Sequence, residues 1–201
     1  MKYIIHLKLK NMHIEESIRK IGEIVSLESI TSKIEVLSEK WDLFPFLSKR
    51  FTDTQDCKSI PLLWSEKMIA VQKWPIFDLF ESEINEINAL LKSSIDESGE
   101  TINAVLTLLP PGKEMRRFKD PILRQEKYGA CHRIQIPILL NQDCSIDTAY
   151  GSTVEIEEGS VYEINHLLNP VGFKNLGKKP RIHLTIDFMP GDIISKYQIS
   201  I

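Results

Sequence analysis

The sequence predicts a mainly β fold of the jelly-roll, cupin-like kind with N-terminal helices, and a change of periodicity near residue 100 is the main reason. Before that point, apolar residues recur with helical spacing in two segments. After it, apolar and polar residues alternate in short runs, and Gly and Pro separate these runs. Short strands with regular turns are typical of a barrel or sandwich, and we expect the helices to cover one of its sheets.

The first hundred residues are expected to be largely helical. Isoleucine, leucine and valine follow helical spacing over residues 15–34 and again over residues 77–92. Between these segments, residues 41–64 are rich in aromatic side chains and end in a strand-like run at 59–64. We expect this run to begin the sheet.

Five later runs have the period of two and the β-branched content of strands. They lie at residues 102–109, 132–140, 153–156, 160–165 and 181–188. Turns are predicted between them where Gly and Pro gather, at residues 110–112, 157–159 and 176–180.

Length and composition are those of an ordinary globular protein. The chain has 201 residues, of which 42% are hydrophobic and 26% charged, with a net charge of -3. That length suits a single domain with a substantial core, so we expect one domain over residues 1–201. Within it, residues 1–100 form a largely helical covering segment and residues 101–190 form the β core.

No feature of the sequence points to nucleic acid or to a membrane. Nucleic-acid binding needs a long basic stripe, whereas the basic residues here come in short runs such as 116–117 and 178–179. Lysines interrupt the apolar residues at the N-terminus, which leaves no continuous hydrophobic segment there. The three cysteines are odd in number and lack CxxC spacing, which favours a reducing compartment. We expect a cytoplasmic protein, and the sequence leaves its oligomeric state open.

The last predicted strand separates polar from apolar side chains completely. In residues 181–187 every odd position is polar or charged, so Arg181 and His183 share one face. Residues 133–137 repeat the pattern, with Arg133 on the polar face. Such a face either points to water, as in most half-buried antiparallel strands, or lines the mouth of a barrel. In the second case a guanidinium can hold a carboxylate with two parallel hydrogen bonds.

Five motifs in a fixed order resemble those of a known group of enzymes. They are Leu-Pro-Pro-Gly at 109–112, the segment 115–121, His-Arg-Ile-Gln-Ile-Pro-Ile at 132–138, Glu-Gly-Ser-Val-Tyr-Glu-Ile-Asn at 158–165, and Arg-Ile-His-Leu-Thr-Ile-Asp at 181–187. Together they look like the aspartyl/asparaginyl β-hydroxylase and proline hydroxylase group of Fe(II) and 2-oxoglutarate oxygenases. The likeness covers roughly residues 41–189.

This resemblance implies a double-stranded β-helix and a place for the co-substrate. In the group, an arginine on a late strand binds the distal carboxylate of 2-oxoglutarate, and Arg181 matches that position. A second arginine on the earlier His-Arg strand often contributes to binding, and Arg133 matches it. His183 shares the face of Arg181 and is expected to reach the same site. The implied ligand is 2-oxoglutarate or a related carboxylate.

The resemblance also implies an Fe(II) site, and here the sequence departs from the group. The group holds iron with two histidines and usually one carboxylate. Its His-x-Asp motif corresponds to residues 118–120, so Asp120 is kept while Phe118 stands in place of the first histidine. Val171 occupies the expected position of the second histidine, and Gln135 replaces a histidine on the His-Arg strand. Three such replacements argue against Fe(II) and for a change of chemistry.

Three functions follow from this pattern, and the sequence leaves open whether the protein is an enzyme. In the first, the chain has lost iron-dependent hydroxylation and binds or acts without metal on an amino acid, a peptide or a small carboxylate. In the second, it is an active dioxygenase that hydroxylates an amino acid or an Asp, Asn or Pro residue through an unusual iron site, built for example from Asp120, His183 and His166. In the third, it is a non-catalytic β-sandwich that binds a partner.

Overall fold

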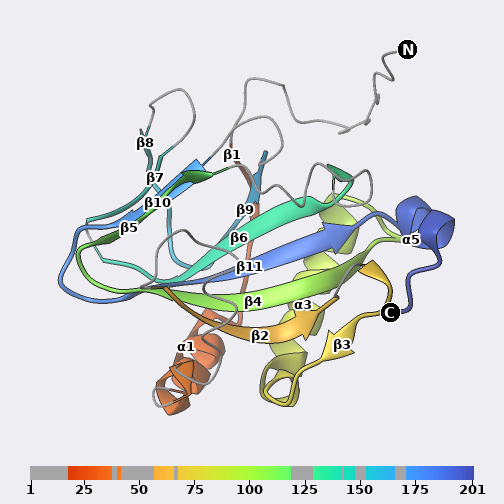
Figure 1. Ribbon diagram of the computed structural model, residues 1–201, viewed down its shortest axis with the longest axis horizontal. Helices are drawn as coiled ribbons and strands as arrows, with labels where there is room; N and C mark the ends of the chain where they lie inside the picture. Colours follow the sequence, from red (N-terminus) through yellow and green to blue (C-terminus); the bar gives the residue numbers. More distant parts are fainter. Residues whose placement is uncertain are drawn as a thin grey trace.

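The described part of the chain is dominated by strands (Figure 1). The computed structural model describes residues 18–37, 40–41, 57–65, 68–118, 129–141, 143–147, 153–165 and 171–201. The strands are β1 (Ile18–Glu23), β2 (Lys58–Trp64), β3 (Gln72–Lys73), β4 (Glu100–Leu109), β5 (Lys113–Phe118), β6 (His132–Leu139), β7 (Cys144–Asp147), β8 (Thr153–Val154), β9 (Ser160–Ile164), β10 (Val171–Asn175) and β11 (Arg181–Met189). The helices are α1 (Leu27–Val36), α3 (Phe77–Ser94) and α5 (Gly191–Tyr197).

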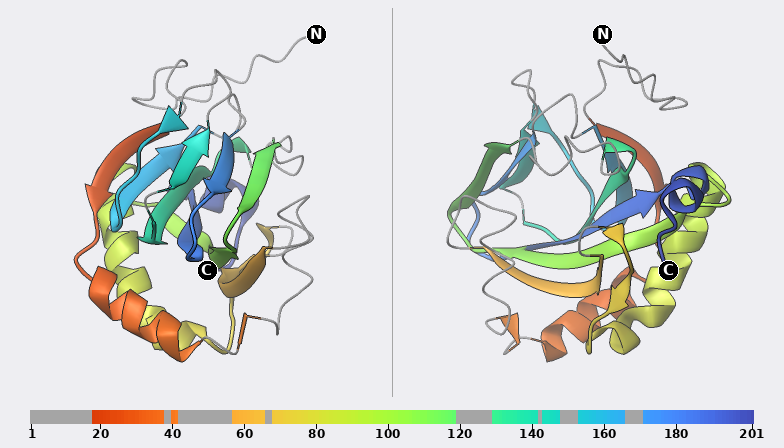
Figure 2. Two further views of the ribbon diagram at one scale, coloured as in Figure 1. Left: turned by 90° about the vertical axis from the view of Figure 1, so that its left-hand side faces the viewer. Right: turned by 45° about the vertical axis from the view of Figure 1, so that its right-hand side comes forward.

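Two antiparallel sheets lie face to face (Figure 2). Within the described residues, the large sheet has the order β1-β9-β6-β11-β4-β2-β3 and the small sheet the order β5-β10-β7-β8. From β4 to β11 the chain passes repeatedly from one sheet to the other, so that β9-β6-β11-β4 of the large sheet face the four strands of the small one. This is the topology of a double-stranded β-helix, and the predicted fold class is confirmed.

The outer face of the large sheet packs against α1 and α3 (Figure 2). The even-numbered residues of β11, with their neighbours on β4 and β6, are apolar and buried on this side. They form one core cluster with helix residues that recur every three or four positions, namely Ile30 and Ile34 of α1 and Phe80, Ile84, Ile87 and Leu91 of α3. The helices therefore take up the apolar face of the sheet, and the polar face is left to the small sheet.

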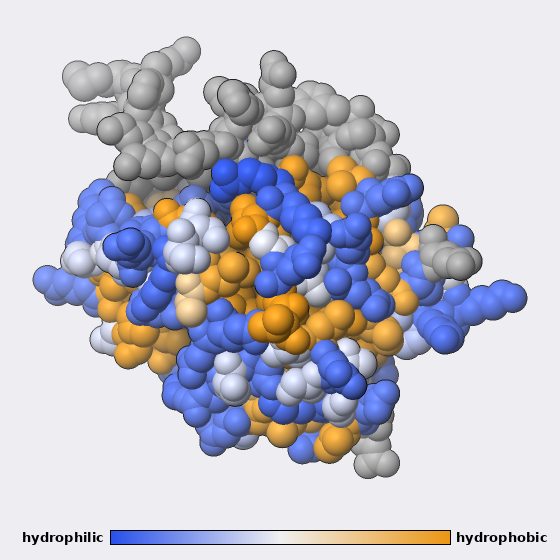
Figure 3. Space-filling model, turned by 180° about the vertical axis from the view of Figure 1, so that it is seen from behind, coloured by the Kyte–Doolittle hydropathy of each residue, from blue (hydrophilic) through white to orange (hydrophobic). Residues whose placement is uncertain are grey.

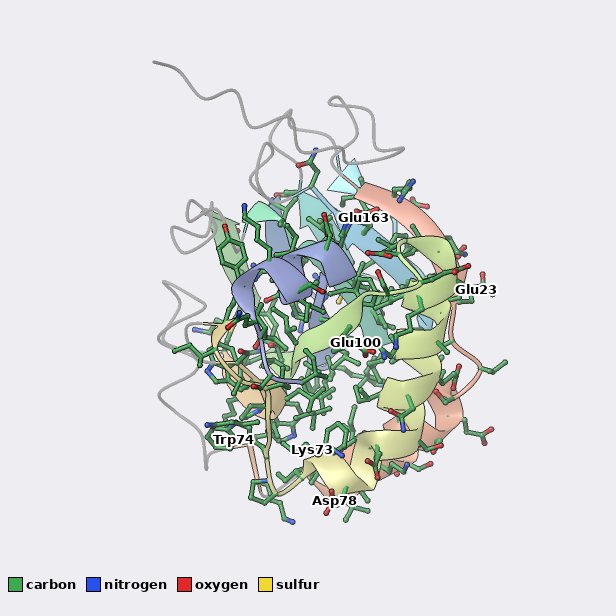
Figure 4. All side chains as sticks on the ribbon, turned by 90° about the vertical axis from the view of Figure 1, so that its right-hand side faces the viewer. Glu23, Lys73, Trp74, Asp78, Glu100 and Glu163 are labelled. Carbon is green, nitrogen blue, oxygen red and sulfur yellow. The ribbon has the colours of Figure 1, made fainter. Side chains whose placement is uncertain are left out.

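The helix expected over residues 15–34 is wrong in its first part. Ile18–Glu23 is a strand that pairs antiparallel with β9, and the helix begins only at Leu27. Tertiary pairing overrides the local period here. Arg19 of β1 donates to Glu163 of β9 at 2.5 Å, which ties this edge strand to the sheet. Glu163 is labelled in Figure 4. The strand-like run at 59–64 is confirmed as β2.

Most of the small sheet was not anticipated from the sequence. Of its four strands, only β8 overlaps a predicted run. The strand Lys113–Phe118 is mainly polar, and Val171–Asn175 contains Gly, Lys and Asn, so neither shows the alternation that marks a strand. These short strands take their form from pairing with each other rather than from their own propensity.

The described surface is a mixture of hydrophilic and hydrophobic residues. Seen from behind, hydrophilic residues surround smaller hydrophobic patches (Figure 3). The exposed large apolar side chains are Val25, Val36, Ile69, Leu79, Leu176 and Ile201. Among the described helices, none is long and apolar enough to cross a membrane.

Candidate functional site

The polar face of β11 lies inside the molecule. Arg181 contacts residues of the small sheet, and its side chain has an exposed fraction of 0%. His183 and Asp187 on the same face are buried as well. Neighbouring strands add further buried polar residues, namely Ser59, Asn103, Thr107, Arg133 and Gln135. The interpretation in which this face points to water is therefore wrong, because the face is buried between the two sheets. The binding role of its arginines stays a prediction.

Arg181 is a buried cation whose hydrogen bonds are incomplete. Its Nη1 donates to the main-chain oxygen of Ser145 at 3.0 Å, and its guanidinium carbon lies 4.9 Å from the centre of the Phe173 ring. Its Nε and Nη2 are buried and have no hydrogen-bond partner among the described residues. Burial lowers the pKa of Arg181 to about 10 from its ordinary 12.5. A buried charge of this kind is costly unless a partner is supplied.

Arg133, the second arginine of this interior, forms a two-bond ion pair with a carboxylate of the protein. Its Nε donates to Oδ1 of Asp187 at 2.8 Å and its Nη2 donates to Oδ2 at 3.1 Å. Asn103 adds a third hydrogen bond to that carboxylate, from Nδ2 at 3.0 Å. The Nε–Nη2 edge of Arg133 is therefore occupied by a carboxylate of the protein. The role of Arg133 in ligand binding stays a prediction, since a ligand would have to displace Asp187 from this edge.

His183 lies beside Arg181, as predicted. Its ring stacks on Phe173 with the centres 5.3 Å apart and an interplanar angle of 20°. Its Nδ1 is buried and has no hydrogen-bond partner in the described part of the chain. Burial, followed by the charge of Arg181, holds the pKa of His183 well below its ordinary value. The ring is therefore neutral at pH 7 and can donate or accept one hydrogen bond at Nδ1.

This buried imidazole predicts a pH dependence of stability. Because the pKa of His183 is lower in the folded than in the unfolded chain, the unfolded chain binds the proton first, and stability falls as the pH drops below about 6.5. The loss approaches about 1.4 kcal/mol per pH unit for one proton. In urea denaturation of the ligand-free protein between pH 7.5 and 5, His183→Gln should lose this slope, whereas the wild type shows it. Equal slopes in the wild type and His183→Gln would contradict the prediction.

The start of the strand that carries Arg181 is fixed by Asn175. This side chain is fully buried, and its Nδ2 donates to the main-chain oxygens of Leu109 and Lys179, both at 2.9 Å. Its Oδ1 accepts from Nδ2 of Asn141 at 3.0 Å. These bonds join the turn before β11 to the end of β4, so the backbone that presents Arg181 is held in place without a ligand.

The two positions expected for iron-binding histidines are direct neighbours. Phe118 of β5 and Val171 of β10 are register partners across the small sheet. Val171 is buried in an apolar cluster that also contains Met115, Ile146 and Phe173. Phenylalanine and valine have no atom that can bind a metal, so the residues at these two positions do not fit Fe(II).

The remaining candidate positions for a metal site provide no set of ligands among the described residues. Asp120 and His166 lie outside the described residues. Gln135 donates from Nε2 to Oγ1 of Thr185 at 2.7 Å. Within the described residues, no group of three or more His, Cys, Asp and Glu side chains could hold a metal ion.

Sequence reasoning missed the residues of the small sheet that complete the Arg181 site. Phe173 and the main chain of Ser145 belong to β10 and β7, which the strand pattern did not reveal. Asn103 lies on the predicted strand β4, but its contact with Asp187 depends on register. The one available signal was the alternation of β4, which places Asn103 and Thr107 on a common face.

The fold of the described residues resembles that of several solved structures. The chain has the double-stranded β-helix fold of 2-oxoglutarate and Fe(II) oxygenases. It is similar to an oxidoreductase of the 2OG-Fe(II) oxygenase family from Burkholderia pseudomallei, with a TM-score of 0.60 and 8% identity over 79% of this chain and 78% of that one. It is also similar to a Pseudomonas putida prolyl-4-hydroxylase, with a TM-score of 0.57 and 11% identity over 88% and 94% of the two chains.

A third similar structure is a viral collagen prolyl hydroxylase from Paramecium Bursaria Chlorella virus-1, solved as a 2OG complex. Its TM-score is 0.54 at 9% identity, over 87% of this chain and 96% of that one. No protein-family model and no curated protein matches the sequence. At these identities the likeness establishes the fold, and function has to be argued from the residues of this chain.

Proposed function

We propose that this protein binds the carboxylate of a small molecule, an amino acid or a peptide at Arg181, and that it has lost iron-dependent hydroxylation. The observation that carries the proposal is the buried Nε–Nη2 edge of Arg181, which has no hydrogen-bond partner among the described residues. A carboxylate offers two oxygens at the spacing of these two donors. The ion pair of Arg133 with Asp187 shows that geometry in the same interior.

Each neighbour of Arg181 has a part in holding such a ligand. The bond from Nη1 to Ser145 and the contact with the Phe173 ring orient the guanidinium and leave its other edge for the ligand. Neutral His183 provides one further hydrogen bond at Nδ1 without adding charge. Burial excludes water and so strengthens the attraction between the guanidinium and the carboxylate.

The loss of iron chemistry rests on Phe118 and Val171. At the two positions that the five motifs match to the iron-binding histidines, the sequence has phenylalanine and valine, which carry no ligand atoms. The two positions are register partners on β5 and β10. 2-Oxoglutarate fits the Arg181 site with one of its carboxylates, since that contact needs no metal. The narrower kinship with aspartyl/asparaginyl β-hydroxylases is part of this proposal and rests on the five ordered motifs.

Calorimetry on protein freed of metal with EDTA tests the proposal. We expect 2-oxoglutarate or a simpler carboxylate to bind with a stoichiometry of one. The ligand should raise the melting temperature equally with and without Fe(II), because a ligand of the native state stabilises it in proportion to its own affinity. Purified protein with one equivalent of iron, together with succinate formation from 2-oxoglutarate, would refute the loss of iron chemistry.

Restoring the two histidines should restore metal binding. Register partners on adjacent strands have Cβ atoms about 5 Å apart, so imidazoles at these positions can share one ion. The double variant Phe118→His, Val171→His should bind Co(II) at least about tenfold more tightly than the wild type, measured by its visible absorption. The matched variant Phe118→Gln, Val171→Gln introduces polar groups without imidazole and should not. Equal Co(II) affinity of the two double variants would contradict the assignment of these positions.

A further inference from the structure

Cys144, the first residue of β7, is the most accessible of the three cysteines. Cys57 and Cys131 are 2% and 3% exposed, whereas Cys144 is half-buried. Burial, followed by the charge of Asp187, raises the pKa of the Cys131 thiol well above its ordinary value. Since the thiolate is the reactive form of cysteine, Cys131 is unreactive at neutral pH. A reagent in solution therefore meets the sulfur of Cys144 first.

The side chain of Cys144 faces the interior between the two sheets, at the end that holds Arg181. Cys144 shares one face of β7 with Ile146, which is fully buried in the apolar cluster between the sheets. Arg181 donates from Nη1 to the main-chain oxygen of Ser145, the next residue along β7. The Cys144 thiol donates a weak hydrogen bond to Oδ1 of Asn175 at 3.6 Å. The sulfur thus lies near the guanidinium while one side of it stays open to water.

The guanidinium of Arg181 attracts negative charge on this sulfur. Burial lowers the pKa of Arg181, and the thiolate charges of Cys144 and then Cys57 act in the opposite direction. The attraction between two charges is mutual. Nε and Nη2 of Arg181 have no hydrogen-bond partner in the part of the chain that the structure describes. Asp143 precedes Cys144 but is exposed, so its repulsion acts through water and is weak.

From these features we infer that Cys144 is a site of oxidation by peroxides, with Arg181 as the residue that promotes the reaction. The thiolate sulfur attacks one oxygen of hydrogen peroxide, an S–O bond forms and the O–O bond breaks. The sulfur is oxidised and the peroxide is reduced. The leaving hydroxide takes the proton of the attacked oxygen, so the products are a sulfenate and water. The reacting group belongs to the chain, so this reaction goes beyond the proposed function and requires no bound carboxylate.

The rate of alkylation by iodoacetamide, an uncharged reagent, tests the part of Arg181 at pH 7.5. We expect Arg181→Met and Arg181→Gln to lower the rate at Cys144 at least about fivefold, because both remove the charge that favours the nucleophilic thiolate. Arg181→Lys keeps the charge and should react within about twofold of the wild type. Lys196→Met, the same charge change at an exposed position on α5, should leave the rate unchanged. Circular dichroism identifies the variants that are folded.

Oxidation itself gives the second measurement. After treatment with hydrogen peroxide and dimedone, which traps sulfenic acids, peptide mass spectrometry should find the adduct on Cys144, and Cys144→Ser should lose it. Arg181→Met should form the adduct more slowly than the wild type. An adduct mainly on Cys57 or Cys131, or equal rates in the wild type and the folded Arg181→Met and Arg181→Gln variants, would overturn the inference. A failure of carboxylates to bind in calorimetry would bear on the proposed function alone.

Discussion

Replacing Arg181 with methionine should stabilise the ligand-free protein while it removes carboxylate binding. Burial lowers the pKa of this guanidinium from 12.5 to about 10, which corresponds to roughly 3 kcal/mol of unfavourable free energy carried by the charged form. Methionine fills a similar volume without charge. The loss of the hydrogen bond to Ser145 offsets about 1 kcal/mol, so we expect a net gain of about 1–2 kcal/mol at pH 7.5.

The pH dependence of the stability gives a second prediction for Arg181→Met. Because the pKa of Arg181 is lower in the folded chain, its destabilising effect is complete below pH 10 and is relieved only between about 10 and 12.5. The stability difference between the wild type and Arg181→Met should thus be constant from pH 7 to 9. Urea denaturation measures it, with Lys196→Met as the control that should change stability by less than about 0.5 kcal/mol. Destabilisation of the folded Arg181→Met variant would contradict the view of Arg181 as an uncompensated charge.

Substitutions in the ion pair between Arg133 and Asp187 should lower the stability, which is the opposite of the effect expected for Arg181→Met. Removal of either partner leaves the other charge buried, so Arg133→Met and Asp187→Leu should each cost about 3–5 kcal/mol of stability. The double variant removes both charges and should recover most of this loss. A double-mutant cycle from urea denaturation gives the coupling free energy, which should be several kcal/mol.

Additive effects of the two substitutions would show that Asp187 does not compensate Arg133. Asn103 supplies an internal check, because its Nδ2 donates to the same carboxylate. Asn103→Leu removes this hydrogen bond and the one that its Oδ1 accepts from the main-chain nitrogen of Ser65 at 2.7 Å, but it leaves both charges paired. Its cost should therefore be smaller than that of Arg133→Met. Replacement of Arg181 is thus expected to raise the stability, whereas replacement of Arg133 on the same interior face is expected to lower it.

Much of the large sheet could be predicted from the sequence because its strands alternate strictly. In Arg181–Met189 this alternation places Arg181 and His183 on one face, and the structure agrees. The alternation does not indicate which face is buried, since the inner wall of this barrel is itself polar. Burial became evident only from the contacts of Arg181 with β7 and β10.

The small sheet and the pairing of Arg133 could not be predicted, for different reasons. Val171–Asn175 is short and mixed in polarity, so its extended form depends on β5 and β7. The ion pair of Arg133 with Asp187 requires the register that sets these residues opposite each other across β6 and β11. Register is a property of two strands together, and neither strand carries it alone.

Complete burial of Arg181 also has a consequence for the speed of binding. A guanidinium with no exposed surface cannot be reached by simple collision, so a ligand must wait for the protein to open. Association is then slower than diffusion would allow, and a bound ligand has to wait for the same opening before it leaves. Asn175 joins the turn before β11 to the end of β4, so we expect this movement in other parts of the molecule. If the proposed ligand binds at Arg181, we therefore expect slow exchange and a long residence time.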